Sequence, residues 1–213
     1  MGKKSKLQKY LESQEFVIKN ECAISLVSTK LKIIGAQLSM NHDRQVIYSI
    51  SSRIKSYESL IGKIKRKKLS GEIPMVLDKI NDLAGVRVVC TYTDDLYQIA
   101  DRICCQKDIE VLKRKDYIKN PKSSGYRSLH LILQVPIQFE DREEKIKIEV
   151  QLRTSAMDYW AELDYQLQYK KEYQSDKDQD TIQEIKKELK DYASVIENID
   201  KQVLELRNKI EAL

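Results

Sequence analysis

The feature that most constrains this chain is the segment 145–153, in which every second residue is apolar. Successive side chains of a β-strand point to opposite faces, so this alternation predicts a strand. Glu149, Gln151 and Arg153 then share the face opposite to the buried one. A strand that buries one side and carries a carboxylate, an amide and a guanidinium on the other indicates the floor of a polar cleft.

A basic loop, residues 115–130, precedes this strand and has Gly125 near its centre. Glycine allows the backbone to approach a ligand closely, and the ring of Tyr126 is suited to stacking on a base. Three further side chains of the loop can contact phosphates: Lys122, Arg127 and His130. The loop and the strand together predict an anionic, nucleotide-like ligand.

Two carboxylates are candidates for a metal site. Asp82 lies shortly before Gly85 and a β-branched segment, 86–92, which predicts a strand. Glu149 lies on the polar face of the strand described above. Two carboxylates that meet across a sheet suit a Mg²⁺ ion that bridges phosphate oxygens. Taken alone, an aspartate before a strand is more often a cap or turn residue.

Composition excludes several classes of protein. The net charge of +5 is too small for a nucleic-acid coat protein, although basic residues cluster at 63–68 and 113–127. Either cluster is also compatible with an ordinary solvated surface. The four cysteines show no C-x-x-C spacing, which predicts reduced thiols and neither a disulfide framework nor a zinc site. No segment approaches the roughly 20 apolar residues of a membrane span, and the N-terminus lacks the apolar region of a signal peptide. We therefore expect a soluble, cytoplasmic protein.

The pattern of apolar residues predicts an α+β fold. The first seventy residues contain no proline, and apolar stripes over 26–38 and 50–64 predict helices. The second of these helices would carry Arg53, Lys55, Ser59 and Lys63, with Lys55 on a different side; by spacing alone, a solvated face is the simpler interpretation. Further along, a helix is predicted at 75–83, and another that Asp94-Asp95 caps and that ends at about 105. Strands are predicted at 86–92, 109–112, 129–135 and 145–152. Proline 136 is expected to end the third of these strands. The order of elements indicates a mixed sheet with a helical face.

Two helices are predicted at the C-terminal end, separated by a polar spacer at 174–180. The first covers 154–169. The second has an apolar heptad seam over four heptads, formed by Ile182, Ile185, Leu189, Tyr192, Ile196, Ile199, Val203, Leu206 and Ile210. The seam is compatible with packing on the N-terminal helices of the same chain, or with oligomerisation.

Four ordered motifs resemble the RelA/SpoT-type alarmone synthetases, and among them the small single-domain members. The resemblance covers about residues 50–171. It rests on the segments 82–88 (DLAGVRV), 115–118 with 124–130 (KDYI, SGYRSLH), 149–154 (EVQLRT) and 157–161 (MDYWA). The resemblance implies a nucleotidyltransferase-like mixed β-sheet flanked by helices. It divides the chain into N-terminal helices at 1–45, a synthetase domain at 46–173 and a C-terminal amphipathic helix at 174–213.

The implied reaction moves the β,γ-pyrophosphate of ATP to the 3′-hydroxyl of GDP or GTP. Asp82 and Glu149 would bind Mg²⁺, and Glu149 would accept the proton of the attacking hydroxyl. The residues implied for ATP are Arg53, Lys55, Ser59, Lys63, Arg87, Arg114 and Lys115, with Arg87 and either Arg114 or Lys115 on the adenine. Those implied for the acceptor are Lys122, Tyr126, His130, Gln151 and Asp158, with Tyr126 stacked on the guanine.

The chain departs from the family pattern at the acceptor side. Asp164-Tyr165 stands where the family often has Glu-His, and Asp158 where it often has Asn. Two histidines, His42 and His130, are too few for the metal site of the family's hydrolase domain, so we expect a synthetase without hydrolase activity.

The acceptor is therefore left open. Some small relatives are toxins that pyrophosphorylate the 3′-CCA end of tRNA and are neutralised by a protein antitoxin, and the basic N-terminal residues would suit a tRNA backbone. A non-catalytic nucleotide or RNA sensor is a third hypothesis, which the two carboxylates and the loop tyrosine disfavour. A homo-oligomer joined through the terminal helices is expected, with a tetramer as one of its states.

Overall fold

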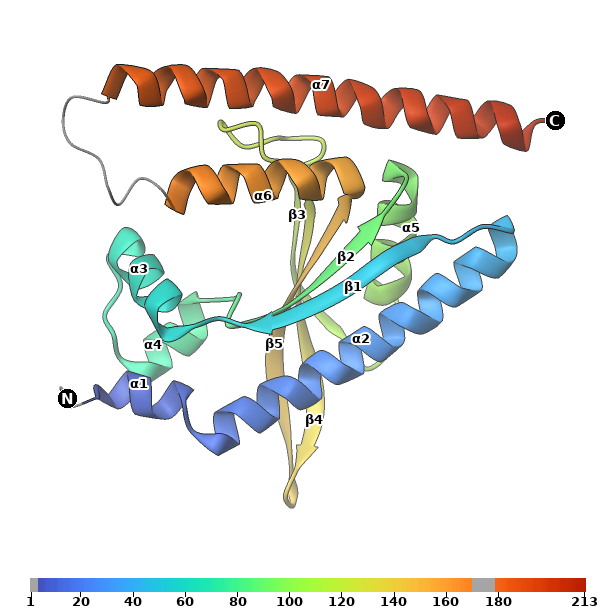
Figure 1. Cartoon of the computed structure of the whole chain (residues 1–213). Helices are drawn as coiled ribbons and strands as arrows, with labels where there is room; N and C mark the ends of the chain where they lie inside the picture. The colour runs from blue at the N-terminus through green and yellow to red at the C-terminus, as the bar shows by residue number, and fades with distance from the viewer. Residues whose placement is uncertain (1–3, 170–178) are drawn as a thin grey trace.

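A mixed five-stranded sheet forms the centre of the computed structural model, which describes residues 4–169 and 179–213 (Figure 1). The strands are β1 (Ile47–Ile54), β2 (Ala84–Cys90), β3 (Glu110–Asp116), β4 (Leu129–Phe139) and β5 (Arg142–Thr154). Their spatial order is β1-β2-β5-β4-β3. Only β2 and β5 pair in parallel; the other three pairs are antiparallel. The predicted α+β fold with a mixed sheet is confirmed.

The strand β1 corrects the prediction that the first seventy residues are helical. Its residues Ile47, Ile50 and Ile54 are spaced by three and four, which imitates a helical stripe. The irregular spacing has a structural cause, because the register with β2 shifts between Ile47 and Ser49. The segment is also rich in β-branched residues, and it pairs antiparallel with the whole of β2. Arg53 is therefore on a strand, and Lys55 follows it in a loop.

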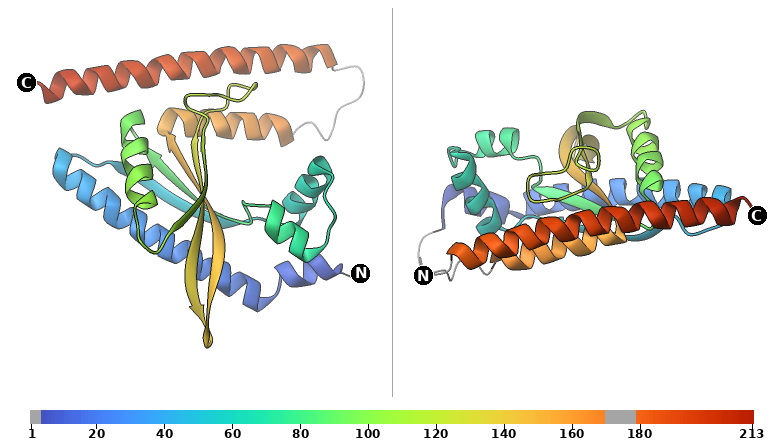
Figure 2. Two further views of the ribbon diagram at one scale, coloured as in Figure 1. Left: turned by 180° about the vertical axis from the view of Figure 1, so that it is seen from behind. Right: turned by 90° about the horizontal axis from the view of Figure 1, so that it is seen from above.

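Two helices cover one face of the sheet. The long helix α2 (Gln14–His42) follows the short helix α1 (Lys6–Leu11) and runs across the strands, and α5 (Thr93–Cys104) packs beside it (Figure 2). Their apolar side chains and the inward residues of the strands form the main hydrophobic core. The core thus occupies one side of the sheet and leaves the polar side chains of β5 on the other.

The start of α5 differs from the prediction. Its N-cap is Tyr92, which makes no capping hydrogen bond through its side chain, so Asp94-Asp95 does not cap the helix. Asp95 is instead fully buried and accepts two hydrogen bonds from the guanidinium of Arg44, at 2.7 and 2.9 Å. A bidentate pair of this kind compensates the burial of the carboxylate.

A second, smaller apolar cluster lies beside the sheet. Helices α3 (Tyr57–Lys67) and α4 (Ile73–Lys79) pack with α1, and the cluster contains Leu60, Ile64 and Val76. The side-chain oxygen of Ser56 accepts a hydrogen bond from the N–H of Ser59 and so caps α3. This cluster fixes the basic helix α3 at the margin of the sheet's polar face.

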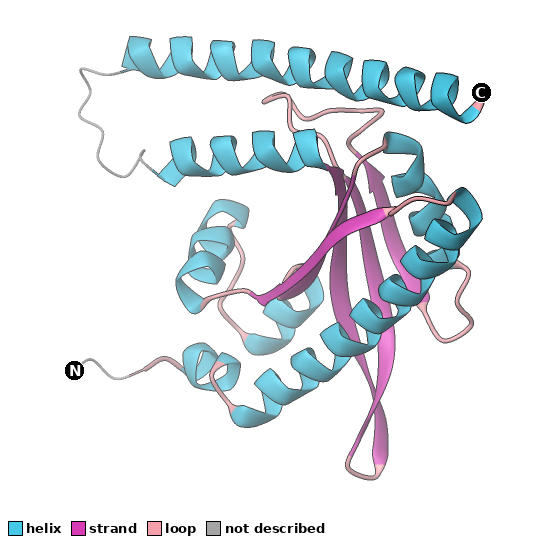
Figure 3. Ribbon diagram, turned by 45° about the vertical axis from the view of Figure 1, so that its right-hand side comes forward, coloured by secondary structure: helices cyan, strands magenta, loops and turns pink. Residues whose placement is uncertain are grey.

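Pro136 lies inside β4 and does not end it, contrary to the prediction. It pairs with Lys145 of β5, whereas the pairing of β4 with β3 ends at Gln134. Beyond Gln134 the outer edge of β4 has no neighbouring strand, so a residue without an N–H group is tolerated there. The β4–β5 hairpin consequently extends past the rest of the sheet (Figure 3).

The C-terminal helices are α6 (Ser155–Tyr169), which continues directly from β5, and α7 (Gln179–Glu211). Residues 174–178 of the predicted spacer lie outside the described residues, and α7 begins at Gln179. α7 packs on α6 and α5, and the two helices run side by side in Figures 1 and 2.

The heptad seam of α7 splits into two stripes. Leu189 is buried against the chain, whereas Tyr192 and Leu206 are 56% and 58% exposed. Packing within the chain therefore uses only part of the seam, and it involves α6 and α5 rather than the N-terminal helices. In the part of the chain that the structure describes, no helix is both long and apolar enough to cross a membrane. All four cysteines are unpaired in the structure.

Candidate active site

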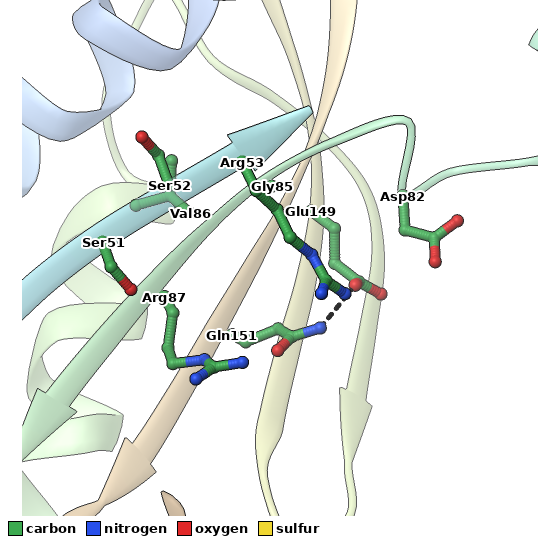
Figure 4. Close-up of a pocket in the computed structure, with 9 residues that line it drawn as sticks. All are labelled: Ser51, Ser52, Arg53, Asp82, Gly85, Val86, Arg87, Glu149 and Gln151. Carbon is green, nitrogen blue, oxygen red and sulfur yellow. Dashed lines mark hydrogen bonds between the residues drawn. The ribbon is translucent and has the colours of Figure 1, made fainter. Parts of the chain in front are cut away.

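Two adjoining cavities, of about 200 and 500 Å³, lie over the polar face of the sheet. They share Arg53, Asp82, Arg87, Glu149 and Gln151 (Figure 4). All five strands contribute lining residues, and β4 contributes His130 to the larger cavity. The larger cavity is walled by α3, by the loop between β3 and β4, and by α6. Most of its lining is polar and charged, as a site for a charged ligand requires.

The strand β5 forms the floor, as the alternation predicts. Ile148, Val150 and Leu152 are fully buried in the core, and Glu149 and Gln151 point into the cavities. The register of the sheet places Gly85 of β2 opposite Glu149, where the absence of a side chain keeps the carboxylate accessible. A Cβ added to Gly85 would make an ordinary van der Waals contact, 3.4 Å, with the carbonyl oxygen of Glu149.

Glu149 is held by two neighbours. The side-chain amide of Gln151 donates to its Oε2 at 2.7 Å, and Nδ1 of His130 lies 3.2 Å from its Oε1. Burial alone would raise the pKa of Glu149, but the hydrogen bond and charge of His130 and the hydrogen bond of Gln151 outweigh burial and lower this pKa. The carboxylate is therefore ionised at neutral pH and able to accept a proton or a cation.

Asp82 is paired with two lysines. Its Oδ2 lies 2.7 Å from Nζ of Lys63 and 3.2 Å from Nζ of Lys55. Burial raises the pKa of Asp82, but the hydrogen bond from Lys63 and the charges of both lysines outweigh that effect and hold the pKa below its usual value. Its other oxygen, Oδ1, is buried and has no hydrogen-bond partner. A buried carboxylate oxygen without a donor is a free ligand for a cation.

A chain of hydrogen bonds lies at the opposite end of the larger cavity. The hydroxyl of Tyr126 lies 2.8 Å from Nε2 of His130 and accepts a hydrogen bond from Arg153 at 2.7 Å. Arg153 also donates to Gln151 at 3.0 Å and to Asp158 at 2.8 Å. The chain connects the loop tyrosine to Glu149 through His130. Burial raises the pKa of Tyr126, so its hydroxyl remains protonated.

Hydrogen bonds at its start and around Gly125 shape the loop that carries Tyr126, residues 117–128, which is called the acceptor loop below. The Oδ1 of Asp116 accepts hydrogen bonds from the N–H groups of Ile118 and Lys119, at 3.0 and 2.9 Å. Lys122 and Gly125 close a turn, in which the N–H of Gly125 donates to the carbonyl of Lys122 at 2.8 Å. Gly125 has a φ of +91°, which an L-residue rarely adopts.

Lys122 stands over two aromatic rings of the acceptor loop. Its Nζ lies 4.9 Å from the ring centroid of Tyr117 and 4.4 Å from that of Tyr126. Burial lowers the pKa of Lys122, with Lys115 adding repulsion, although the negative charge of Glu149 opposes the change. An anion that enters this end of the cavity would meet the ammonium group of Lys122.

The residues implied for ATP divide into two groups. Arg53, Lys63, Arg87 and Lys115 line the cavities, and Lys55 contacts Asp82 at their margin. Ser59 and Arg114 do not line them. Ser59 belongs to the exposed first turn of α3, where its hydroxyl accepts a hydrogen bond from Ser56. Arg114 pairs with Asp101 of α5 at 2.6 Å, because neighbouring residues of β3 face opposite sides of the sheet.

The residues implied for the acceptor also divide. Lys122, Tyr126, His130 and Gln151 line the larger cavity. Asp158, on α6, instead bridges two guanidinium groups, with its Oδ1 3.2 Å from Arg87 and 2.8 Å from Arg153. Its charge is thereby compensated within the protein, which reduces the expected repulsion of an acceptor phosphate.

Several lining residues were assigned no ligand from the sequence: Tyr117, Ser124, Arg153, Ala161, Glu162, Asp164 and Tyr165. Among them, Arg153 was predicted on the polar face of the strand together with Glu149. The residues of α6 could not be predicted, because their contribution depends on how that helix is placed over the sheet.

Comparison with known proteins agrees with this architecture. Residues 52–174 match a family model described as a region found in RelA / SpoT proteins. The chain is 34% identical over 189 residues to GTP pyrophosphokinase YwaC of Bacillus subtilis, covering 89% of this chain and 87% of that protein. It is 29% identical over 199 residues to GTP pyrophosphokinase YjbM of the same organism, covering 93% and 90%.

Solved structures are similar over almost the whole chain. The small alarmone synthetase 1 of Bacillus subtilis bound to its product pppGpp superimposes with a TM-score of 0.82 at 28% identity, covering 95% of this chain and 98% of that one. The small alarmone synthetase 2 of the same organism gives a TM-score of 0.78 at 32% identity, covering 92% and 98%. By sequence, fold and site composition, the chain belongs to the RelA/SpoT family.

Proposed function

We propose that this protein is a (p)ppGpp synthetase, a GTP diphosphokinase that transfers the β,γ-pyrophosphate of ATP to the 3′-hydroxyl of GDP or GTP. The observation that carries the proposal is the pairing of Asp82 and Glu149 in one cavity between basic walls. The relatives named as GTP pyrophosphokinases, which match about nine tenths of the chain, support the same activity.

In this reaction the 3′-oxygen of the acceptor attacks the β-phosphorus of ATP. The new bond joins that oxygen to the β-phosphorus, the bond from the β-phosphorus to the α,β-bridging oxygen breaks, and AMP leaves with that oxygen. The hydroxyl proton passes to Glu149, whose ionised carboxylate is held in place by His130 and Gln151. Because two hydrogen bonds fix the base, little reorganisation is needed when the proton moves.

The donor and the acceptor would occupy different ends of the larger cavity. Arg53 and Lys63 would contact the ATP phosphates, and Arg87 with Lys115 would contact the adenine. Tyr126 would stack on the guanine, with Lys122 near the acceptor phosphates. Glu149 lines the same cavity as both groups of residues, so the two nucleotides would meet over it.

Mg²⁺ is the cation we propose, with Asp82 and Glu149 as its protein ligands. The buried, unpartnered Oδ1 of Asp82 fits this role. Among the described residues, no group of three or more carboxylate, imidazole or thiol side chains could hold a metal ion. The nucleotide phosphates would therefore supply the remaining oxygens, as is usual for Mg²⁺. When bound, the cation offsets negative charge on the phosphoryl oxygens.

The first test is a transfer assay with γ-labelled ATP and Mg²⁺, in which GDP, GTP and deacylated tRNA are offered separately. Label in a guanosine nucleotide that disappears in the Glu149→Gln variant would support the proposal. Label only in tRNA would point to the toxin-type reaction, and an antitoxin would then be sought. No contact in the described part of the structure favours tRNA, so this alternative remains a hypothesis from the sequence.

Replacing Tyr126 by Ala tests the acceptor end of the site. Loss of base stacking, worth about 1–3 kcal/mol, should weaken GDP binding about 5- to 150-fold. ATP binding should change much less, because the ring lies on the acceptor loop. Equal losses of affinity for GDP and for ATP would contradict the stacking of guanine on Tyr126.

We further propose a cytoplasmic homo-oligomer that associates through its terminal helices, with a tetramer as one possible state. Support comes from the exposed apolar stripe of α7, which includes Tyr192, Ile199 and Leu206. Light scattering coupled to gel filtration would measure the molar mass. A monomer at micromolar concentration would contradict this expectation.

A further inference from the structure

The C-terminal helix α7 contacts the acceptor loop although it contributes no residue to the two active-site cavities among the described residues. In Figures 1 and 3 the loop between β3 and β4 reaches up to α7. Two loop residues, Gly125 and Arg127, touch the helix, and Tyr126 lies between them in the sequence. The helix therefore acts on the residues flanking the ring that would bind guanine.

The first contact is steric. A Cβ added to Gly125 would lie 2.5 Å from the Cβ of Ala193 and 3.7 Å from the Cα of Lys190. The backbone of the loop thus rests directly on α7, which is possible only because both residues are small. The remaining void between Gly125, Ala193 and Trp160 is about 10 Å³, which is too small for a side chain.

The second contact is ionic. One nitrogen of the Arg127 guanidinium pairs with Glu197 of α7, and another donates to the carbonyl of Ile118 at 2.7 Å. Arg127 therefore connects both ends of the acceptor loop to the helix. Its side chain is mostly buried, which makes such a pair more directional than one in open solvent.

Trp160 of α6 braces the same junction. Its indole N–H donates to the backbone carbonyl of Leu189 in α7 at 2.9 Å, and its ring lies 6.3 Å from the ring of Tyr126. The side chain is 2% exposed. Trp160 is also the single tryptophan of the chain, so its fluorescence reports on this junction alone.

We propose that Ala193 and Glu197 are positioning residues for the acceptor nucleotide: by holding Gly125 and Arg127, they orient Tyr126 toward the cavity. This inference rests on the proposed function, since it assigns Tyr126 to the guanine base. The inference predicts different effects on the two substrates. Arg53 and Lys63, at the ATP end, belong to β1 and α3, and these elements lie apart from α7 in Figure 1. A change in α7 should therefore affect the acceptor and spare ATP.

The test uses two α7 variants of the full chain and two matched controls. Ala193→Leu adds bulk under Gly125, and Glu197→Gln removes the charge opposite Arg127 at nearly constant volume. The controls, Val195→Leu and Glu205→Gln, make similar changes at exposed positions of the same helix. Thermal unfolding first establishes that each variant is folded.

Two measurements then follow. Binding of GDP and of GTP is titrated without ATP by the fluorescence of Trp160, and the KM of each substrate is determined in the transfer reaction. Relief of an overpacked contact by movement of the loop should weaken acceptor binding about tenfold in Ala193→Leu. In Glu197→Gln, where one charge is lost, we expect acceptor binding to weaken about two- to fivefold. The KM for ATP should stay within about twofold, and both controls should behave like the wild type.

The outcomes separate this inference from the proposed function. Unchanged affinity for GDP and GTP in a folded Ala193→Leu protein would overturn the inference. Equal increases in the KM for the acceptor and the KM for ATP would also overturn it. If the wild-type protein transfers no pyrophosphate to GDP or GTP, the proposed function itself fails and the inference falls with it. A rise confined to the acceptor KM, with kcat retained at saturating acceptor, would support a positioning role.

Discussion

Asp200 is a buried carboxylate whose neutralisation should stabilise the protein. It lies on α7 with 8% of its surface exposed and accepts a hydrogen bond from the hydroxyl of Thr154 at 2.8 Å. The same hydroxyl accepts a hydrogen bond from the N–H of Met157 in the first turn of α6. Burial raises the pKa of Asp200 from 3.8 to about 6, although Thr154 and Arg127 oppose the shift. Asparagine can accept the same hydrogen bond without a charge.

The sign of the effect follows from proton binding. The folded protein binds the Asp200 proton more tightly than the unfolded chain, so its contribution is most favourable below pH 3.8 and is lost as the pH rises to about 6. A shift of about two pKa units corresponds to about 3 kcal/mol, of which about 1.4 kcal/mol falls between pH 5 and pH 8. Partial screening by solvent reduces this, so we expect a difference of about 1 kcal/mol.

The assay is urea unfolding of the wild type and of Asp200→Asn at pH 5 and pH 8, at one protein concentration. The difference between the two proteins isolates Asp200, because the other titrating groups are common to both. The stability gained by the variant should be about 1 kcal/mol larger at pH 8 than at pH 5. Glu205→Gln, at an exposed position of α7, should show no such change. A gain that is equal at both pH values would refute the argument from a buried charge.

Three further predictions concern the active site. Glu149→Gln should lower kcat, measured by rapid-quench transfer, by on the order of a hundred- to ten-thousandfold. The calorimetric Kd for ATP should stay nearly unchanged. Near-normal turnover would exclude Glu149 as the general base. Lys115→Ala should weaken ATP binding about tenfold and Arg114→Ala less than about twofold, because only Lys115 lines the cavity; the reverse order in calorimetry would reassign the adenine. Lys63→Met should strengthen the binding of Mg²⁺ alone, since it removes the cation closest to Asp82; an unchanged calorimetric Kd for Mg²⁺ would argue against competition at this carboxylate.

The sheet floor was predictable because its signal is local. In β5 the alternation of apolar and polar residues defines both the strand and the face that carries Glu149 and Gln151. The acceptor loop was predictable for a similar reason, because Gly125 and its basic neighbours follow one another in the chain. The placement of the acceptor loop over the cavity was not predictable, because the loop contacts α7, some 70 residues further along the chain.

The edge strand β1 shows where the reasoning from periodicity fails. The register shift near Ile47 gives this strand an apolar spacing that also fits a helix. Tertiary pairing with β2 decides between the two, and such pairing cannot be read from a short window. The error had a consequence for the site: Arg53 and Lys55 were expected on the helix of Lys63, where Lys55 would point away. In the structure a strand end and a helix bring Lys55 and Lys63 to the same carboxylate.

That convergence has a consequence for the order in which charges are exchanged. In the protein without ligands, Asp82 is neutralised by Lys55 and Lys63, and Glu149 is hydrogen-bonded to His130. A cation alone would bind Oδ1 of Asp82 against the repulsion of the two ammonium groups on Oδ2, and a polyphosphate alone would have to compete with Asp82 for the same lysines. When both arrive together, the phosphates take the lysines and the cation takes the carboxylates, so each exchange removes the obstacle to the other. Nucleotide and cation should accordingly bind with positive coupling, and by linkage each should raise the affinity for the other by the same factor.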